Sequence, residues 1–189
     1  VFPLANKLDP EQGMIPDELI AKMAELGYFG IVVPEKYGGL GLGAFEYCLV
    51  AEELSRAWMS VGSLIARGNS MIGMETMSEE WRADVMPRVA RGEYLGAFAM
   101  SEPNAGSDVA NISTRAVRDG DDYLITGSKY WCTFADGADF VTVIARTFSD
   151  PDPQRRHKGL SAFVLEKPRG ELPAGVQGSP IPKIGYFGW

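Results

Sequence analysis

The chain is poor in the two residue types that most often bind transition metals. Its 189 residues include one histidine and two cysteines, Cys48 and Cys132. The cysteines are too far apart for a CxxC motif, too few for a zinc site, and too few for the disulfide framework of a small secreted domain. Because both lie in apolar sequence patterns, we expect reduced thiols buried in the core of a cytoplasmic protein, and no metal site.

Long apolar runs and excess positive charge are also lacking. The longest apolar stretches, residues 26–34 and 140–145, fall well short of the roughly 20 residues that a membrane-spanning helix needs, so we expect no membrane span. The formal net charge is −7, which argues against nucleic-acid binding because no strong basic field is available to attract phosphates. The first residues lack the charged-then-apolar pattern of a secretory signal, in keeping with a cytoplasmic location.

The period of the hydrophobic pattern changes once along the chain, near Tyr94. Before it, apolar residues at helical spacing predict helices over 16–26, 44–58, 61–77 and 78–90. A glycine-rich loop over 30–43 should pack onto their core. After it, short apolar runs between turn residues predict strands over 94–100, 112–118, 123–126, 129–134, 140–146 and 160–166, with hairpin turns at Asp119-Gly120 and Gly127-Ser128. The sequence therefore predicts an α+β fold, with an all-α domain over 1–94 and a small all-β, barrel-like domain over 95–189.

A loop of small and polar residues follows the first predicted strand, in the sequence Phe98-Ala-Met-Ser-Glu-Pro-Asn-Ala-Gly-Ser-Asp108. The proline after Glu102 disfavours helix there, so the chain should be extended or turned. Gly106 allows close backbone approach, and Ser101 and Ser107 offer hydrogen bonds beside open backbone N–H groups. Such a loop suits a planar ligand with polar edges and phosphate, although an ordinary strand-to-loop connection has the same pattern.

A second segment, residues 121–134, is expected to form two short strands around the Gly127-Ser128 turn. In the second strand Trp131 and Thr133 would share one face, while Cys132 would point to the other, because side chains alternate along a strand. An indole beside a hydroxyl can pack against a flat ring and hydrogen-bond its edge. A single tryptophan is more often a core residue, but together with the preceding loop this pair predicts a flavin cradle.

With these residues in view, the sequence resembles the acyl-CoA dehydrogenase family. The resemblance rests on residues 98–108, on Gly127-Ser-Lys-Tyr-Trp-Cys-Thr133, and on Gly27-Tyr-Phe-Gly-Ile-Val-Val-Pro-Glu-Lys-Tyr-Gly-Gly-Leu-Gly41. These blocks occur in the family's order and at its usual separations, and they span nearly the whole chain. The family has an N-terminal helical domain, a middle β-domain and a C-terminal four-helix domain. The sequence resembles the first two.

The resemblance implies a bound FAD and an acyl-CoA substrate. The flavin contacts that it implies are Phe98, Ala99, Met100, Ser101, Gly106, Ser107, Trp131, Cys132 and Thr133. The hydroxyls of Ser101 and Thr133 would lie near flavin N5 and O4, and Trp131 would pack against the ring. Ser107 would also contact the acyl-CoA. In similar enzymes the glutamate that removes the α-proton belongs to the C-terminal domain, so no catalytic residue is assigned here.

The implied reaction is α,β-dehydrogenation of an acyl-CoA thioester to a trans-2-enoyl-CoA, a step of fatty acid metabolism. The resemblance further implies an electron-transferring flavoprotein as electron acceptor and a homodimer or homotetramer. Flavin monooxygenases and acyl-CoA oxidases of the same fold are alternatives. A non-catalytic homologue that binds flavin or CoA is another.

Two other segments bear on the substrate. The basic cluster Arg155-Arg-His-Lys158 could contact CoA phosphates, but a solvated loop between strands is the favoured interpretation. The ending at residues 183–189 carries bulky aromatic residues where similar proteins often have small polar ones. It hints at a short or branched acyl group, such as that of a methylsuccinyl-CoA-type substrate.

Overall fold

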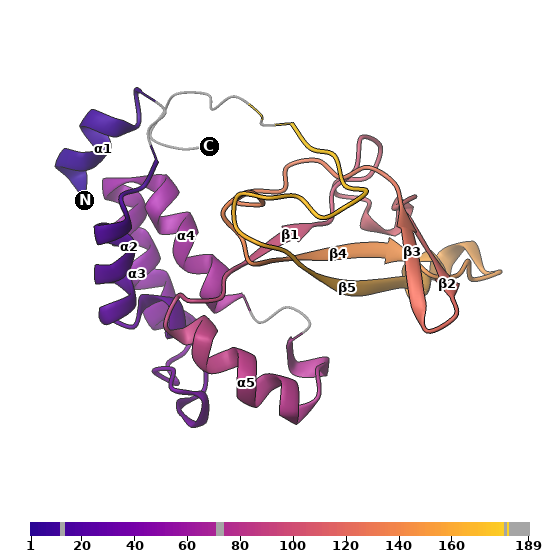
Figure 1. The fold of residues 1–189 in the computed structure, drawn as a ribbon, viewed down its shortest axis with the longest axis horizontal. Helices are drawn as coiled ribbons and strands as arrows, with labels where there is room; N and C mark the ends of the chain where they lie inside the picture. Colours follow the sequence, from indigo (N-terminus) through magenta and orange to yellow (C-terminus); the bar gives the residue numbers. More distant parts are fainter. Residues whose placement is uncertain (12–13, 71–73, 180, 182–189) are drawn as a thin grey trace. The chain divides into compact units, whose positions relative to one another are not determined.

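The computed structural model describes residues 1–11, 14–70, 74–179 and 181 of the chain. The chain divides into two compact units, one made of Val1–Leu95 with the residues after Gly175, and one made of Gly96–Gly175. Within the described residues, α-helices build the first unit and strands the second (Figure 1). The predicted α+β class, with the helices first and the strands second, is confirmed.

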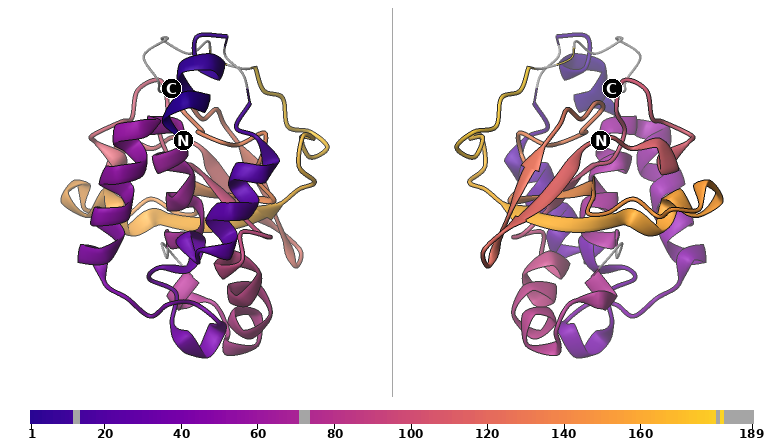
Figure 2. Two further views of the ribbon diagram at one scale, coloured as in Figure 1. Left: turned by 90° about the vertical axis from the view of Figure 1, so that its left-hand side faces the viewer. Right: turned by 90° about the vertical axis from the view of Figure 1, so that its right-hand side faces the viewer.

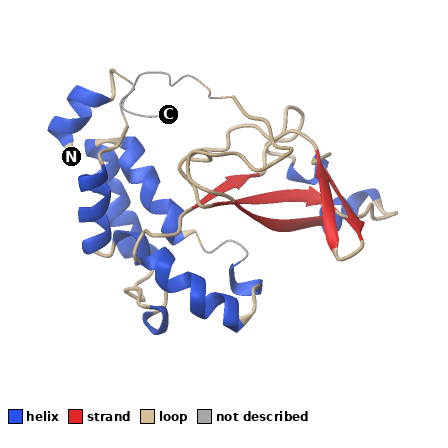
Figure 3. Cartoon of the chain, viewed as in Figure 1, coloured by secondary structure: helices blue, strands red, loops and turns tan. Residues whose placement is uncertain are grey.

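The α-helices of the first unit match most of the predicted positions (Figure 3). They are α1 Phe2–Leu8, α2 Asp17–Glu25, α3 Ala44–Ala57, α4 Met59–Asn69 and α5 Glu79–Ala90, with short 3-10 helices at Tyr28–Gly30, Glu35–Tyr37 and Met74–Thr76. The predictions for α2, α3 and α5 are confirmed to within one residue at each end. The predicted helix over 61–77 is too long, because α4 ends at Asn69. Residues 71–73 of that prediction lie outside the described part. The sequence did not predict α1.

Local capping explains the bounds of α5. The hydroxyl of Ser78 accepts a hydrogen bond from the backbone N–H of Trp81 at 3.1 Å, as an N-cap serine should. Glu79 and Glu80 place negative charge in the first turn, where it interacts favourably with the helix dipole. Beyond the last turn, Gly92 adopts a left-handed conformation with φ of 70°, which turns the chain out of the helix.

The loop over 30–43 packs onto the core of the first unit, as predicted. Ile31 and Val33 within it are buried. Asn69, at the end of α4, holds the start of this loop through its side-chain amide. The Nδ2 atom donates to the carbonyl of Tyr28 at 2.7 Å, and Oδ1 accepts from the N–H of Val32 at 3.0 Å. One side chain therefore satisfies two backbone groups of an irregular segment.

Helix α3 packs against α4 (Figure 2). None of the residues of α3 is fully buried in the described part of the chain. Its large apolar side chains Phe45 and Leu49 are 71% and 50% exposed. Cys48 is exposed and Cys132 is half-buried. The prediction that both cysteines are core residues is therefore wrong, because apolar neighbours in sequence do not ensure that the same face of a helix is covered.

The strands of the second unit form one mixed sheet around β4. They are β1 Gly96–Ala99, β2 Arg115–Asp119, β3 Asp122–Thr126, β4 Phe140–Arg146 and β5 Leu160–Glu166. The antiparallel partner β5 follows β4 along its whole length. Consequently β1 and β2 share the other edge of β4, and both run parallel to it. Strand β1 pairs with residues 140–143, and β2 pairs only with Arg146. Strands β2 and β3 form a hairpin whose two-residue turn is Gly120-Asp121, next to the predicted position.

The predicted strand over 129–134 is absent, and Gly127-Ser128 is not a hairpin turn. Trp131 and Phe134 have positive φ angles of 59° and 65°, and the N–H of Thr133 donates to the carbonyl of Trp131 at 2.9 Å. This tight turn breaks the alternation on which the shared face of Trp131 and Thr133 was based. Gly127 instead allows close packing, because a Cβ there would lie 2.3 Å from Thr114 Oγ1.

A buried hydrogen bond between α1 and the start of α4 gives a test of the first unit. Trp58 Nε1 donates to Asp9 Oδ1 at 2.9 Å, and the two residues are 0% and 2% exposed. Trp58→Phe keeps an aromatic ring but removes the donor, so we expect the free energy of unfolding to fall by about 1–3 kcal/mol in urea denaturation. Trp81→Phe, on a half-exposed ring, is the matched control and should change it by less than about 0.5 kcal/mol. Equal losses in both variants would contradict the assignment.

Candidate functional site

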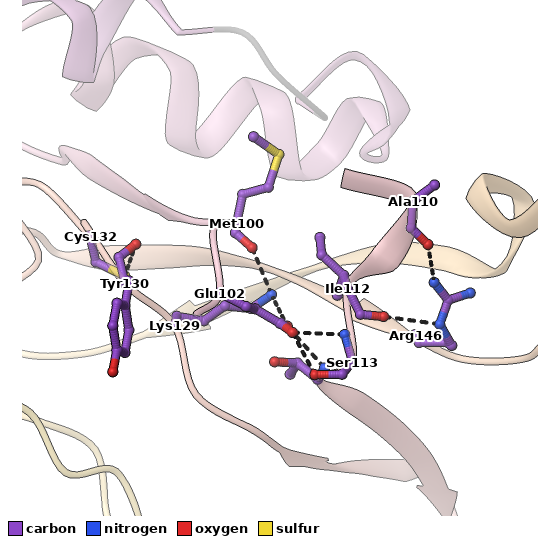
Figure 4. Close-up of polar contacts among 10 residues, drawn as sticks. Met100, Glu102, Ala110, Ile112, Ser113, Lys129, Tyr130, Cys132 and Arg146 are labelled. Atoms are coloured by element: carbon purple, nitrogen blue, oxygen red, sulfur yellow. Dashed lines mark hydrogen bonds and ion pairs between the residues drawn. The ribbon is translucent and has the colours of Figure 1, made fainter. Parts of the chain in front are cut away.

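The two motif segments of the second unit lie side by side, although the second is not a strand (Figure 4). The backbone N–H of Tyr130 donates to the carbonyl of Ser101 at 2.8 Å. The ammonium group of Lys129 donates to the carbonyl of Met100 at 2.9 Å. The sequence interpretation required these segments to meet, and the structure brings them together through backbone carbonyls rather than through a sheet.

A buried ion pair between Glu102 and Lys129 lies where the segments meet. Lys129 Nζ is 2.8 Å from Glu102 Oε1, and the two side chains are 10% and 3% exposed, respectively. The carboxylate also accepts from the backbone N–H groups of Ser113 and Thr114 at 2.7 and 2.9 Å, and from the hydroxyl of Ser113 at 2.6 Å. A buried carboxylate is stable only when paired and hydrogen-bonded, and this one is both.

This arrangement determines the protonation state of Glu102. Burial raises the pKa of its carboxyl group, but the hydrogen bonds from Lys129, Ser113 and Thr114 outweigh that effect and hold the pKa well below its ordinary value of 4.5. Glu102 is therefore a carboxylate at neutral pH. Its partners leave it no role as a proton acceptor, so the group is structural rather than a general base.

The loop after Glu102 is closed on itself and then anchored by an arginine. Glu102 and Ala105 exchange two backbone hydrogen bonds, of 2.8 and 3.2 Å, which confirms the turn expected before Pro103. Further along, Arg146 of β4 donates to the carbonyls of Ala110 and Ile112 at 2.7 and 3.1 Å. The segment between Ser101 and β2 is consequently fixed at both ends.

The remaining site residues differ in exposure. Phe98 and Ala99 end β1, with Ala99 buried and Phe98 half-buried, and Met100 follows half-buried. Gly106 and Ser107 are exposed. A Cβ added to Gly106 would meet nothing within 4 Å, so no part of the described protein requires its close approach.

Three groups are available to a ligand near the junction, the place where the Ser101 loop meets residues 129–133. Among the described residues, no protein partner occupies the hydroxyls of Ser101 and Thr133 or the Ser101 N–H. Trp131 is 67% exposed, with Tyr130 edge-on to it at 6.2 Å between ring centroids. Burial raises the pKa of the Cys132 thiol, an effect that the charge of Lys129 partly offsets, so this thiol is not an activated nucleophile.

Sequence reasoning missed the buried pairing of Glu102 and Lys129. Glu102 was placed in a turn without a role, and Lys129 was read only as part of the second motif. A usable signal was present, because Glu102 follows the apolar run of the first motif and Lys129, of opposite sign, directly precedes the aromatic pair of the second. When two such segments meet in a core, their charges are expected to pair, since a lone buried charge is very unfavourable.

The basic cluster lies on a 3-10 segment, Pro153–Gly159, whose charged side chains are exposed. Arg155 lies 3.7 Å from a carboxylate oxygen of Asp150, and Arg156 lies 3.5 Å from one of Asp108. Two of its charges therefore have protein partners. Elsewhere in the described residues, no helix is both long and apolar enough to cross a bilayer, and no group of three histidine, cysteine or acidic residues could hold a metal ion.

Comparison with known proteins identifies the family. Residues 1–93 match the acyl-CoA dehydrogenase N-terminal domain, and residues 97–188 match the acyl-CoA dehydrogenase middle domain. Together the two matches include nearly every residue. The chain belongs to the acyl-CoA dehydrogenase family.

Individual relatives agree with this assignment. The (2S)-methylsuccinyl-CoA dehydrogenase of Cereibacter sphaeroides is 38% identical over an alignment 197 residues long, which covers 100% of this chain and 35% of that protein. The solved structure of a Mycobacterium smegmatis glutaryl-CoA dehydrogenase in complex with FADH2 is 32% identical with a TM-score of 0.72, over 84% of this chain and 39% of that one. A chain in the electron transferring flavoprotein structure of Acidaminococcus fermentans is 36% identical with a TM-score of 0.72, over 86% and 44%. The chain thus spans less than half the length of these relatives.

The residues at the junction fit a flavin. An isoalloxazine ring needs hydrogen-bond donors at its polar edge and apolar contact on its faces. The N–H and hydroxyl of Ser101 and the hydroxyl of Thr133 supply donors that no described protein group uses, and the exposed indole of Trp131 supplies an apolar surface. The donor set is neutral and polar, and it lies entirely within the second unit.

The lowered pKa of Glu102 predicts how stability depends on pH. Below about pH 4.5 the Glu102 carboxylate is protonated in the unfolded chain but remains ionised in the folded protein. The unfolded state is therefore favoured increasingly as the pH falls, and the stability that Glu102 contributes above that pH is lost. Glu102→Gln removes this titration. We expect the variant to be less stable at neutral pH but to lose stability less steeply between pH 5 and 3, with a slope difference of at most about 1.4 kcal/mol per pH unit. Urea denaturation at several pH values checks this, and parallel profiles for variant and parent would contradict it.

Proposed function

We propose that this chain is the flavin-binding part of an FAD-dependent acyl-CoA dehydrogenase, which converts an acyl-CoA thioester to the trans-2-enoyl-CoA. The observation that carries the proposal is the junction between the Ser101 loop and residues 129–133. There, donors without protein partners lie beside an exposed indole on segments that hydrogen bonds hold together. The FADH2 complex of a related glutaryl-CoA dehydrogenase supports FAD as the cofactor.

When bound, the flavin supplies the hydride-accepting chemistry, while the protein supplies placement and electrostatics. The hydroxyls of Ser101 and Thr133 would donate to the N5 and O4 edge, where a donor would stabilise the charge of the reduced ring. Backbone groups of Phe98, Ala99 and Met100 would line the polar edge, and Trp131 would cover a ring face. Neutral hydrogen bonds are worth about 0.5–1.5 kcal/mol each, enough to tune the flavin but not to hold it alone.

Other roles in the proposal extend beyond the flavin ring. Gly106 and Ser107, both exposed on the loop, are assigned to the cofactor, and Ser107 also to the acyl-CoA. Cys132 contributes through its backbone. The base that removes the α-proton is assigned to none of the 189 residues, because the family places it in the C-terminal domain. The solved structure that contains electron transferring flavoprotein supports that protein as electron acceptor, and a homodimer or homotetramer remains the family expectation.

The proposed substrate has a short or branched acyl group. The similarity to a (2S)-methylsuccinyl-CoA dehydrogenase supports this choice. The aromatic-rich ending that first suggested it, residues 183–189, lies outside the described residues. Reduction of the full natural polypeptide by acyl-CoA thioesters of different length and branching, followed by flavin absorbance without oxygen, would test it.

Reaction with oxygen separates the proposed activity from its alternatives. A dehydrogenase is reduced by acyl-CoA anaerobically and reoxidises slowly in air, whereas an acyl-CoA oxidase reoxidises fast. A flavin monooxygenase is not reduced by acyl-CoA at all, and a non-catalytic homologue binds flavin or CoA without any reduction. Stopped-flow absorbance of the full natural polypeptide separates the dehydrogenase from the oxidase, and both from the two alternatives that acyl-CoA does not reduce. Absence of reduction by any acyl-CoA would overturn the proposal.

Trp131→Ala tests whether the indole packs against the flavin. We expect the purified full polypeptide to carry clearly less FAD, because the stacking contact contributes about 0.5–1.5 kcal/mol beyond buried area. The ratio of visible flavin absorbance to protein measures occupancy. Phe148→Ala removes another exposed aromatic of the second unit, 54% exposed and outside both motifs, and should leave occupancy unchanged. Equal occupancy in both variants would remove Trp131 from the site.

Ser101→Ala tests the donor at the polar edge. Loss of one hydrogen bond to the reduced ring, worth about 0.5–1.5 kcal/mol, should lower the two-electron potential of bound FAD by about 10–30 mV. A redox titration with reference dyes measures it. Ser128→Ala, an exposed hydroxyl in the second motif, should leave the potential unchanged. A potential that stays at the parent value in Ser101→Ala would reject this role for the hydroxyl.

A further inference from the structure

Ser101 is fixed through the two peptide groups that flank it. The carbonyl of Met100 accepts from Lys129 Nζ at 2.9 Å, and the carbonyl of Ser101 accepts from the N–H of Tyr130 at 2.8 Å. A peptide group is planar and trans, so holding its carbonyl also sets the direction of its N–H. The first bond therefore determines where the N–H of Ser101 points. The second fixes the peptide that joins Ser101 to Glu102.

Lys129 is in turn held in place by Glu102. The 2.8 Å contact between them is buried, and the other hydrogen bonds of the carboxylate tie it to Ser113 and Thr114, directly before β2. An exposed ion pair would be mobile and contribute little. A buried pair whose hydrogen bonds are satisfied is rigid. The orientation of the Met100 carbonyl is thus traced, bond by bond, to the start of a sheet strand.

We propose that Glu102 and Lys129 form a positioning pair for the flavin-binding edge, which orients the N–H and hydroxyl of Ser101 toward the cofactor without either residue touching it. This inference rests on the proposed function, because it requires that Ser101 contacts FAD. The pair acts through the Met100 carbonyl on one side. Tyr130, the neighbour of Lys129 in sequence, acts on the other.

Stability alone does not account for a charged pair at this position. Apolar residues of similar volume commonly stabilise a core as well as a buried ion pair does. An apolar side chain at 129, however, could not donate to the Met100 carbonyl, whereas an ammonium group donates to that carbonyl and to the carboxylate at once. The chemistry specific to lysine is therefore the control of one peptide direction next to Ser101.

The test uses the full natural polypeptide loaded with FAD. Lys129→Met keeps an unbranched side chain only one atom shorter and removes both hydrogen bonds. The double variant Glu102→Gln, Lys129→Met also removes the buried charge that the single change leaves unpaired, so it keeps the test available if the single variant does not fold. Lys36→Met is the matched control, because it breaks a 3.0 Å ion pair with Glu79 whose side chains are 61% and 60% exposed.

The decisive readout is the effect of Ser101→Ala on the flavin potential in each background. In the parent and in Lys36→Met, Ser101→Ala should lower the potential by the same amount. In Lys129→Met, and in the double variant, the shift should fall to less than half, because the hydroxyl is no longer aimed at the ring. The dissociation constant for FAD should also rise about ten-fold in both pair variants and not in Lys36→Met. Circular dichroism confirms that each variant is folded.

The possible results separate this inference from the proposed function. A full Ser101→Ala shift in every background, with unchanged FAD affinity, overturns the positioning role and leaves the proposed function intact. A parent protein that binds no FAD overturns both. A parent protein that binds FAD but shows no shift with Ser101→Ala overturns the positioning role and leaves FAD binding intact. Complete loss of FAD from a folded double variant, while Lys36→Met retains it, supports the positioning role. A purely structural role would lower the melting temperature and leave the potential and its response to Ser101→Ala unchanged.

Discussion

A carboxylate buried beside the Ser101 loop is the constraint on which the second unit depends. The side chain of Glu102 is only 3% exposed, and an unpaired charge at such a buried position would be strongly unfavourable. Its carboxylate accepts hydrogen bonds from Ser113 and Thr114, directly before β2, and from Lys129 of the second motif. Segments separated by up to 27 residues in sequence therefore meet at one side chain. The position of Ser101, directly before that carboxylate, is a consequence of this meeting.

Sequence patterns predicted the elements whose bounds are determined locally. Strands β4 and β5 occupy the predicted ranges, because their apolar runs are bounded by turn residues on both sides. Helix α5 starts after a serine cap and ends before a left-handed glycine, both of which are visible in the sequence. In these cases the residues that reveal the bounds of an element in the sequence also cause the chain to start or stop it. Contacts with distant residues are not needed to predict these bounds.

Where distant contacts decide the structure, the patterns predicted less. Residues 129–134 alternate like a strand, yet Lys129 and Tyr130 hydrogen-bond to the loop around Ser101 instead of pairing with β3. Directly after this attachment Trp131 has a positive φ, which no propensity of tryptophan would have suggested. Likewise, the neighbours of Cys48 in sequence are apolar, but its exposure depends on which side of α3 another element covers. The proximity of the two motifs was nevertheless predicted, because one ligand had to contact both.

In the candidate site, hydrogen bonds within the protein hold the backbone rigid, while donors beside it remain free. This combination affects how strongly the donors can hydrogen-bond to a cofactor. A donor that must first break a bond to the protein, or reorient, contributes little to binding or to the energy of the reduced ring. Here the carbonyls around Ser101 are occupied, while among the described residues its N–H and hydroxyl are not. The hydrogen bonds within the protein therefore fix the direction of the donors and leave the donors themselves available. Under the proposed function, a pair of opposite charges that does not contact the flavin would in this way determine how strongly a neutral hydroxyl interacts with it.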